Sequence, residues 1–585
     1  MINRQSPASS FSFAVALFVA AVLPWQIAFY AVPIVSYATE AAAFVGWSLL
    51  LLVLGKYLAM KLPNRAVAGV LCAIALLAAT ASAQLLVGKI LWPSQLVQML
   101  YFLAVAALVT WTAAQIQSLA TRNQIIDAWA WCWLVGCVLS AVAALVQYLQ
   151  WEVSWYIVAP LADAGRIYGN VHQSNQFATL MAMGLPGVVW LNQRNKLSMR
   201  AAAVCAVVIA VVVVMSSSRT GLIQLLWLAA WMTLPHTGKR RLAAPLLLAA
   251  VAAYGLFYAL NQAGIFTYFN SSRLPTMIDA EMGITDSRLS LWRETLTLIA
   301  QNPWAGVGFG QFEFYRTFSD VPNALKIIHV NAHMLPLQIA VEYGLPVAAL
   351  FFALAIYAVL KAGAAWRDPG GNFAMAGIGV VLIHSMTEFP LWYAFILLPF
   401  AFLCGIYLSS TELHTEPAPG RPQKLTGWRR MHMYGALSVL GGIALGITHY
   451  LPTVAMYVLN SKDITRDERL ATSEKAFLYK NWIVYNSIGG TSFEEITKHP
   501  ELITLFDKTS RFYMNEFNMA QYALVLAENG RHEQATRVVA SLRRQASKNL
   551  SDLRAYCQTA SSAGAKRLLE VIDSQEAPQL SAKDF

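Results

Sequence analysis

Long apolar stretches alternate with short polar connections over most of the 585-residue chain. Apolar runs close to the roughly 20 residues that an α-helix needs to cross a bilayer recur from Phe11 to about Leu459. About 12–13 such runs can be distinguished on this criterion. The pattern therefore predicts an all-α polytopic integral membrane protein.

The pattern changes in two places, and these changes suggest four parts. A long polar segment interrupts the apolar runs in the middle of the chain, and charged residues with helical spacing replace them near the end. We expect transmembrane helices over residues 1–261 with an outer loop at 150–174, a large outer loop at 262–332, transmembrane helices over 333–459 and a soluble helical tail at 460–585.

The tail contains a stretch with the appearance of a helix-turn-helix unit. "NMAQYALVLAENGRHEQATRVV", residues 518–539, has the spacing of a tetratricopeptide-type repeat, with Gly530 at the turn. A single unit fits a peptide-binding module and an ordinary helical hairpin equally well. Both interpretations stay open on the sequence.

Composition supports the membrane assignment, and the positions of the basic residues account for the net charge of +11. Hydrophobic residues make up 57% of the chain and charged residues 12%, far below the roughly 25% charged residues of soluble domains. If the N-terminus is cytoplasmic, every inside connection is basic, as the positive-inside rule requires. The charge thus indicates topology rather than a nucleic-acid partner, and it places the tail outside. The inside cations include Lys56, Lys61, Arg65, Arg122, Arg194, Lys196, Arg200, Lys239, Arg240, Arg241, Lys361, Arg367, Arg421, Lys424, Arg429 and Arg430.

Polar residues that topology does not require gather on the outer side, first in "GRIYGNVHQSNQFATL", residues 165–180. Arg166, Gln173 and Asn175 lie at the predicted start of a helix, where free backbone N–H groups and the helix dipole favour an anion. The alternative is a polar cap whose arginine reaches lipid headgroups. An arginine on the outer side breaks the charge bias, which favours a functional role.

A second arginine stands in "SSSRTG", residues 216–221, in a very short connection between two apolar runs. Arg219 is costly so close to hydrocarbon unless it is paired or faces a polar cavity. A structural ion pair with an acidic residue elsewhere is the alternative explanation.

The large loop carries a third polar group. "RLSLWRETLTLIA", residues 288–300, predicts an amphipathic helix lying on the membrane, with Arg293 on its solvated face and Arg288 as a candidate site residue. "PWAGVGFGQF", residues 303–312, is rich in turn-forming glycine. It matches neither a dinucleotide-binding nor a Walker A pattern, so nucleotide binding is unsupported.

The fourth group combines "HVNAHMLPLQIAVEYGLP", residues 329–346, with "HSMTEFPLWYAF", residues 384–395. His329 and His333 would share a helix face if one helix included both, but no H-E-x-x-H glutamate or third ligand accompanies them, so we expect no metal. We interpret His329 as a cap or loop residue and His333 as the functional imidazole. Glu388 and Tyr393 are candidates as well, although Tyr393 fits an interfacial aromatic belt equally well.

In their order along the chain, these elements resemble the O-antigen ligase and polymerase (Wzy_C) superfamily, and within it the PglL-type bacterial protein O-oligosaccharyltransferases, also called pilin glycosylation ligases. "GRIYGNVHQSNQFATL" is similar to the family's R-x-x-G…Q-x-N-Q loop, and "SRLSLWRETLTLIAQNPWAGVGFGQF" to its R…W…P-x-x-G-x-G-x-F element. "NAHMLPLQIAVEYGLP" resembles its H-N-x-x-L-Q-x-x-x-E-x-G helix, and "TEFPLWY" its E-Y-P-L-W-Y span. One departure is Met334, where the family has asparagine: either Asn331 fills the role of that asparagine, or the histidine pocket is modified in this chain.

The resemblance implies en bloc transfer of an oligosaccharide from undecaprenyl-diphosphate to serine or threonine hydroxyls of periplasmic proteins such as pilin. It also implies a multi-pass protein of the bacterial inner membrane, with its active site facing the periplasm. We expect membrane lipids as partners, and neither a cofactor, a metal nor a nucleic acid. The expected roles are catalysis for His333, Arg288 and Arg219, donor binding for Arg166, Gln173, Asn175 and Asn331, and shaping of the pocket for Glu388, Tyr393 and Gln338.

Three other functions remain open. An O-antigen ligase would use lipid A-core as acceptor, and a Wzy-type polymerase would use a second lipid-linked glycan. A transporter or flippase also has many spans, but it places charged residues near the bilayer midplane, often in repeated halves. Here the polar residues gather at one face, which disfavours a transporter.

Overall fold

The computed structural model describes residues 11–234, apart from residues 31, 59–60, 117, 152 and 161–165, and then residues 275–318, 329–410, 427–458 and 464–574, with a few positions between 248 and 259. Parts of the predicted large loop, residues 262–274 and 319–328, lie outside the described residues. So do five of the cations assigned to inside connections: Lys239, Arg240, Arg241, Arg421 and Lys424.

Throughout these described ranges the chain forms helices and no β-strand. Six of the described helices are long and apolar enough to cross a membrane, and shorter apolar helices of 10–17 residues accompany them. These findings confirm the predicted all-α, multi-pass membrane class. The predicted total of about 12–13 spans stays a prediction. The six long segments are Tyr37–Gly55, Arg65–Leu86, Pro93–Ala114, Leu119–Tyr148, Leu345–Ala362 and Gly427–Val458.

The chain divides into two compact units. Unit 1 comprises Met1–Ile74, Tyr101–Met282 and Phe352–Ala444, and unit 2 comprises Ala75–Leu100, Gly283–Phe351 and Leu445–Phe585. Five helices cross a boundary between the units along the chain. They are α3 (Arg65–Leu86), α4 (Pro93–Ala114), α11 (Pro275–Gln301), α14 (Leu345–Ala362) and α17 (Gly427–Val458).

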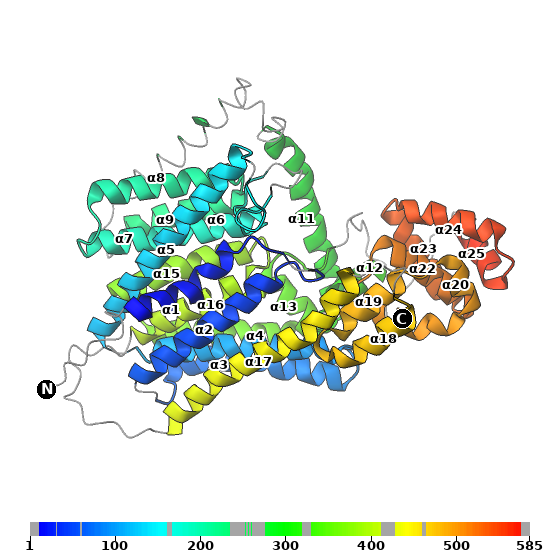
Figure 1. The fold of residues 1–585 in the computed structure, drawn as a ribbon, viewed down its shortest axis with the longest axis horizontal. Coiled ribbons are helices and arrows are strands. Elements are labelled where there is room, and N and C mark those ends of the chain that lie inside the picture. The colour runs from blue at the N-terminus through cyan, green and yellow to red at the C-terminus, as the bar shows by residue number, and fades with distance from the viewer. Residues whose placement is uncertain are drawn as a thin grey trace. The chain divides into compact units, whose positions relative to one another are not determined.

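Unit 1 is a bundle in which α1 lies alongside α2 and α5, and α15 lies alongside α9 and α16 (Figure 1). Its remaining elements are α1 (Phe11–Ala21), η2 (Leu23–Gln26), α2 (Tyr37–Tyr57), α5 (Leu119–Tyr148), α6 (Ser174–Ala182), α7 (Gly184–Gln193), α8 (Met199–Met215), α9 (Arg219–Thr233), η5 (Ala365–Arg367), α15 (Pro369–Ser385), η6 (Pro390–Trp392) and α16 (Ala394–Ser409).

Stacked aromatic rings fill the core of unit 1. The ring of Trp129 stacks on Trp133 and on Phe402, with centroid distances of 5.2 and 5.0 Å. Small residues allow the helices to approach: a Cβ at Gly46 would lie 2.5 Å from the carbonyl oxygen of Val19, so α1 and α2 touch backbone to backbone. Close approach of this kind is how membrane helices associate without a hydrophobic driving force.

A proline near the start of α7 interrupts the hydrogen-bond ladder between α6 and α7. Pro186 has no backbone N–H and cannot bond the carbonyl of Ala182, so the helical ladder is interrupted at this point. Two short helices therefore replace one long span, and α6 begins at the polar segment that contains Gln173 and Asn175.

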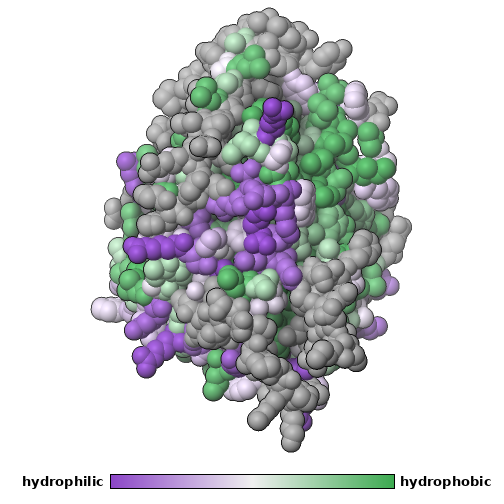
Figure 2. Space-filling model, turned by 90° about the vertical axis from the view of Figure 1, so that its left-hand side faces the viewer, coloured by the Kyte–Doolittle hydropathy of each residue, from purple (hydrophilic) through white to green (hydrophobic). Residues whose placement is uncertain are grey.

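Charged side chains of unit 1 are paired near the start of α5. The Arg122 guanidinium contacts both carboxylate oxygens of Asp368, at 2.7 and 3.0 Å, and Asp127 contacts Arg194 and Lys196, each at 2.8 Å. A charge within a membrane domain is costly unless it is paired in this way. Figure 2 shows one face of the molecule on which hydrophilic side chains gather centrally beside a hydrophobic flank.

Unit 2 combines the middle of the chain with the C-terminal tail. Its core joins Phe314 and Phe318 of α12 to buried residues of α22 and α23. Its elements are α12 (Phe312–Phe318), α13 (Leu335–Tyr343), α18 (Arg466–Lys475), η7 (Phe477–Tyr479), α19 (Lys480–Gly489), α20 (Phe493–Lys498), η8 (Pro500–Leu502), α21 (Ile503–Ser510), α22 (Glu516–Glu528), α23 (His532–Arg544), α24 (Lys548–Thr559) and α25 (Ala563–Asp573) (Figure 1).

The predicted helix-turn-helix of the tail is present as α22 and α23. Gly530 lies in the turn with φ of +74°, a conformation that glycine adopts without steric cost. The interior of this hairpin is apolar, with Leu524 and Val538 fully buried. The helical tail is therefore confirmed, and peptide binding by it stays a prediction.

A buried ion pair fastens α11 to α12. The Arg316 Nε lies 2.6 Å from the Glu294 Oε2, and the two side chains are 4% and 1% exposed. Arg293, the neighbouring cation on α11, is exposed as its helical spacing predicted. The sequence placed all three residues in one polar loop but did not predict which of them pair.

Replacing Arg316 by methionine should destabilise the full chain, because Glu294 would stay buried without its cation. Removing one member of a buried pair costs about 3–5 kcal/mol, so the midpoint of thermal unfolding of the detergent-solubilised protein should fall clearly. Lys498→Met is the matched control, because Lys498 and its partner Glu494 are 66% and 71% exposed. An Arg316→Met midpoint equal to that of the control would contradict the role of the pair.

Candidate active site

In unit 1, Asn175 joins polar side chains from three segments. Its Oδ1 accepts hydrogen bonds from Ser218 Oγ at 2.7 Å and Arg166 Nη2 at 3.4 Å, and its Nδ2 donates to Glu388 Oε1 at 3.3 Å. Arg166 also donates to the Ser217 carbonyl at 3.1 Å. We call Arg166, Asn175, Ser218 and Glu388 the Asn175 cluster. It unites Arg166 and Asn175, which the sequence had singled out in one segment, with Glu388, which it had singled out in another.

Two helices begin at the Asn175 cluster. Gln173 caps α6 by accepting the Gln176 N–H at 2.8 Å, and Ser218 caps α9 by accepting the Gly221 N–H at 3.0 Å. The other N–H groups of a first helical turn have no partner within the helix, and the helix dipole adds positive potential. Because Ser218 contacts Asn175, both positive helix ends lie at one place, which favours an anion.

Arg219 is the first residue of α9 and is exposed. It follows Ser217, which adopts a left-handed conformation with φ of +53°, and Ser218, which belongs to the cluster. The short connection therefore places a second cation at the same helix end. Sequence reasoning selected Arg219 as a candidate site residue. It did not predict that the preceding serines fix the turn.

The loop that carries Arg166 is held by membrane helix α5. Gln147 accepts the Tyr168 and Gly169 N–H groups at 3.2 and 2.9 Å, and it donates to the Gly169 carbonyl at 2.7 Å. Gln147 is buried, and Gly169 has φ of +54°. These hydrogen bonds therefore hold the loop between Arg166 and α6 against α5.

Tyr393 and a residue that sequence reasoning missed meet at the start of α16. The Gln176 side chain hydrogen-bonds to Tyr393, and Glu40 Oε2 accepts the N–H of Ala394 at 2.6 Å. Glu40 is buried on α2. The signal that could have found it is a carboxylate inside an apolar run, which is a functional hint in membrane proteins.

In unit 2, Asn331, His333 and Gln338 lie together around the start of α13. The Ala332 N–H donates to Gln338 Oε1 at 2.6 Å, and both residues are buried. His333 is half-buried and left-handed, with φ of +52°, a conformation that costs a residue other than glycine roughly 1–2 kcal/mol. Such an outlier persists only where its surroundings hold it.

The predicted helix start differs by two residues from the observed one. Helix α13 begins at Leu335, and Met334 occupies its N-cap without a side-chain hydrogen bond. His333 therefore precedes the helix rather than opening it. Asn331, the proposed replacement for the missing asparagine, is buried two residues before His333; its substitute role stays a prediction.

The two histidines are in contact although neither belongs to α13. Their rings lie edge to face with centroids 5.4 Å apart. Among the residues that the structure describes, no group of three or more His, Cys, Asp or Glu side chains is placed to hold a metal ion. Arg288, the remaining predicted residue, lies on α11 of the same unit and is half-buried.

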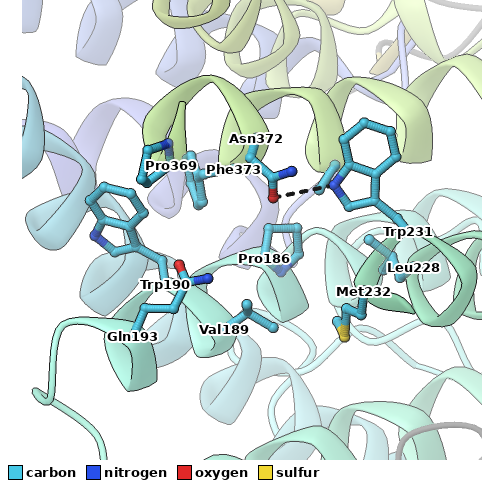
Figure 3. A pocket seen from close by; sticks show the side chains of 11 residues that line it. Pro186, Val189, Trp190, Gln193, Leu228, Trp231, Met232, Pro369, Asn372 and Phe373 are labelled. Carbon is cyan, nitrogen blue, oxygen red and sulfur yellow. Dashed lines mark hydrogen bonds between the residues drawn. The ribbon is translucent and has the colours of Figure 1, made fainter. Parts of the chain in front are cut away.

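A small cavity lies elsewhere in unit 1 and contains none of the predicted site residues. Side chains of α7, α9 and α15 line it, including Trp190, Trp231 and Phe373 (Figure 3). Its walls are mostly apolar, and Trp231 Nε1 donates to Asn372 Oδ1 at 3.3 Å across one side. The polar chemistry of the unit therefore gathers in the Asn175 cluster rather than in this cavity.

Family models match three segments of the chain. Residues 167–191 match the protein glycosylation ligase model, residues 203–352 the O-antigen ligase model, and residues 372–555 the C-terminal model of virulence factor membrane-bound polymerases. The first segment includes Gln173 and Asn175, and the second includes Arg219 and His333. Arg166 immediately precedes the first segment.

Two curated proteins of Acinetobacter baylyi are similar to the chain. A general O-oligosaccharyltransferase is 25% identical over 304 residues, which is 51% of this chain and 53% of the relative. A ComP-specific O-oligosaccharyltransferase is 21% identical over 285 residues, 48% of this chain and 51% of the relative. The chain thus spans about half the length of these curated relatives. Together, the matches confirm the resemblance to PglL-type protein O-oligosaccharyltransferases of the Wzy_C superfamily.

Proposed function

We propose that the chain is an oligosaccharyltransferase of the bacterial inner membrane. It moves a glycan en bloc from undecaprenyl-diphosphate to serine or threonine hydroxyls of periplasmic proteins such as pilin. The names of both curated relatives describe O-linked oligosaccharide transfer. The apolar helices and the matched family segments agree with a reaction on a lipid-linked donor.

The observation that carries this proposal is the convergence of two helix starts and two arginines at the Asn175 cluster. Arg166 contacts Asn175 directly, and Arg219 follows Ser218 at the start of α9. A diphosphate offers several oxygens to guanidinium groups and to free N–H groups. Glu388 is the acidic member of the cluster, so it can accept hydrogen bonds from sugar hydroxyls while the cations hold the diphosphate.

In the proposed reaction, the hydroxyl oxygen of the acceptor attacks the first carbon of the glycan. The bond from this carbon to the diphosphate oxygen breaks, and its electron pair leaves with undecaprenyl-diphosphate. The proton of the hydroxyl passes to the imidazole of His333, which suits a general base near neutral pH. Arg288 and Arg219 stabilise the charge that develops on the leaving diphosphate. This assignment of roles requires no metal.

A second candidate function keeps the donor and changes the acceptor. The match of residues 372–555 to virulence factor membrane-bound polymerases favours a second lipid-linked glycan as acceptor. The O-antigen ligase match favours lipid A-core instead. All three reactions need the same donor chemistry, so the acceptor distinguishes them.

Deleting the protein from its native cell should remove glycan from specific exported proteins. Mass spectrometry of periplasmic and surface proteins, with and without the gene, should show a glycan mass on serine or threonine that disappears in the deletion strain. Lipopolysaccharide should keep its normal ladder on gels. Loss of O-antigen with intact protein glycans would favour ligation to lipid A-core, and shortened chains would favour polymerisation.

His333→Ala should abolish glycan transfer, because no other group in this assignment takes the acceptor's proton. The measurement is incorporation of glycan into purified acceptor by membranes that contain equal amounts of each variant. His329→Ala is the matched control, since its ring contacts that of His333 but has no assigned chemical role. Transfer by His333→Ala at more than about one hundredth of the wild-type rate would be too fast for loss of a general base, which contributes about 10²–10⁴-fold.

Arg219→Ala should weaken use of the donor. A hydrogen bond to a charged group is worth about 1.5–3 kcal/mol, so kcat/KM for the lipid-linked donor should fall by roughly 10- to 100-fold. Arg293→Ala removes an exposed arginine of α11 and should leave kcat/KM within about twofold, as surface substitutions usually do. Equal effects of the two substitutions would remove Arg219 from the diphosphate site.

A further inference from the structure

The glycine-rich segment 303–310, which we call the brace loop, contacts the C-terminal end of α13. The Val307 N–H donates to the carbonyl of Val341 at 2.8 Å, and the Gly308 N–H donates to that of Glu342 at 3.0 Å. The Gly310 N–H donates to the carboxylate Oε1 of Glu342 at 2.8 Å. Both the backbone and the side chain of Glu342 are therefore held by this loop.

Glycine is required where the brace loop meets the helix end. Gly306 has φ of +62°, and a Cβ there would lie 2.4 Å from the carbonyl carbon and oxygen of Glu342. Gly344 has φ of +87°, and its Cβ would lie 2.4 Å from the carbonyl oxygen of Trp304. The glycines of "PWAGVGFGQF" thus serve a backbone-to-backbone contact, which explains a motif that nucleotide binding does not.

A buried amide of α3 ties the two segments together. Gln84 Oε1 accepts the Phe309 N–H at 2.9 Å, and Gln84 Nε2 donates to the carbonyls of Glu342 and Ala305 at 2.8 and 3.1 Å. Gln84 is buried, so these bonds are shielded from competing water. The position of Glu342 is therefore determined from two sides.

From Glu342 the contacts continue toward His333. Gln338 lies one helical turn before Glu342, so the two side chains lie on the same face of α13. The Gln338 Oε1 accepts the N–H of Ala332 at 2.6 Å, so this side chain supports the backbone directly before His333. Gln338 and Glu342 are both buried. Ala332 immediately precedes His333, whose left-handed backbone needs such support.

We propose that Gln338 and Glu342 are positioning residues that fix the imidazole of His333 for proton transfer, with the brace loop as their anchor. The inference rests on the proposed function, in which His333 is the general base. A general base must stay within hydrogen-bonding distance of the proton that it takes, and a displacement of about 1 Å can cost two orders of magnitude in rate.

The test compares Glu342→Leu and Gln338→Leu with the conservative Glu342→Gln in the full chain. Both leucine variants should lower kcat by about tenfold or more while KM for the donor stays within about twofold, because the base is misplaced but donor contacts are kept. Glu342→Gln should recover most of kcat, because its amide oxygen still accepts the Gly310 N–H. The double leucine variant should be no slower than the worse single variant, as expected of residues in one chain of contacts.

Gln521→Leu is the matched control for loss of a buried glutamine. Gln521 lies on α22 and donates to the carbonyls of Ile488 and Thr491, so it holds the helical tail rather than α13. This variant should lower the unfolding midpoint and leave kcat per folded molecule within about twofold. A fall in kcat equal to that of Gln338→Leu would overturn the positioning role.

Hydrogen exchange provides a readout that does not depend on activity. Gln338→Leu and Glu342→Leu should speed exchange in the peptide that contains the Ala332 N–H and leave α22 protected. Unchanged exchange there overturns the proposal, whether or not the chain transfers glycan. If His333→Ala abolishes transfer and both leucine variants keep wild-type kcat, positioning fails and the proposed function stands. If His333→Ala keeps its activity, the base assignment and the positioning role fail together.

Discussion

A polar group that enters a bilayer must find its hydrogen-bond partners within the protein, and this requirement determines where the chain can place its chemistry. Helix starts, ends and breaks offer such partners, because backbone N–H and C=O groups are free there. Unit 1 follows this rule, because the Asn175 cluster forms where α6 and α9 begin and where α15 gives way to η6. The Pro186 break lets α6 be a short helix of its own.

The same requirement explains the difference between the two groups of candidate residues. In unit 1 the polar side chains contact one another. The Asn175 amide hydrogen-bonds to three side chains through its oxygen and its nitrogen. In unit 2 the imidazole of His333 is half-buried, and the buried side chains of Gln338 and Glu342 accept hydrogen bonds from backbone N–H groups. The first arrangement suits binding of a charged ligand. The second suits a single reactive group on a rigid support.

The sequence was sufficient to predict the fold class, because a membrane requires long apolar runs and favours basic connections on its inner side. It also predicted the amphipathic helix with Arg293 exposed, and the hairpin turn at Gly530. Hydrogen bonds between residues that are far apart in the sequence could not be predicted in the same way. Glu342 and Gln84 are 258 residues apart, and Asn175 and Glu388 are 213 apart. Neither periodicity nor local charge carries information about such partners, so the resemblance was needed to group the site residues.

The histidines show how a spacing argument can miss the local geometry. A separation of four residues would bring His329 and His333 together on a helix, and their rings do meet, with centroids 5.4 Å apart. However, α13 begins only at Leu335, and the left-handed backbone of His333 turns the chain just before it. Helical phase therefore does not set the direction of the imidazole. That direction depends on the turn, and the turn is held through Ala332 by Gln338, five residues after His333.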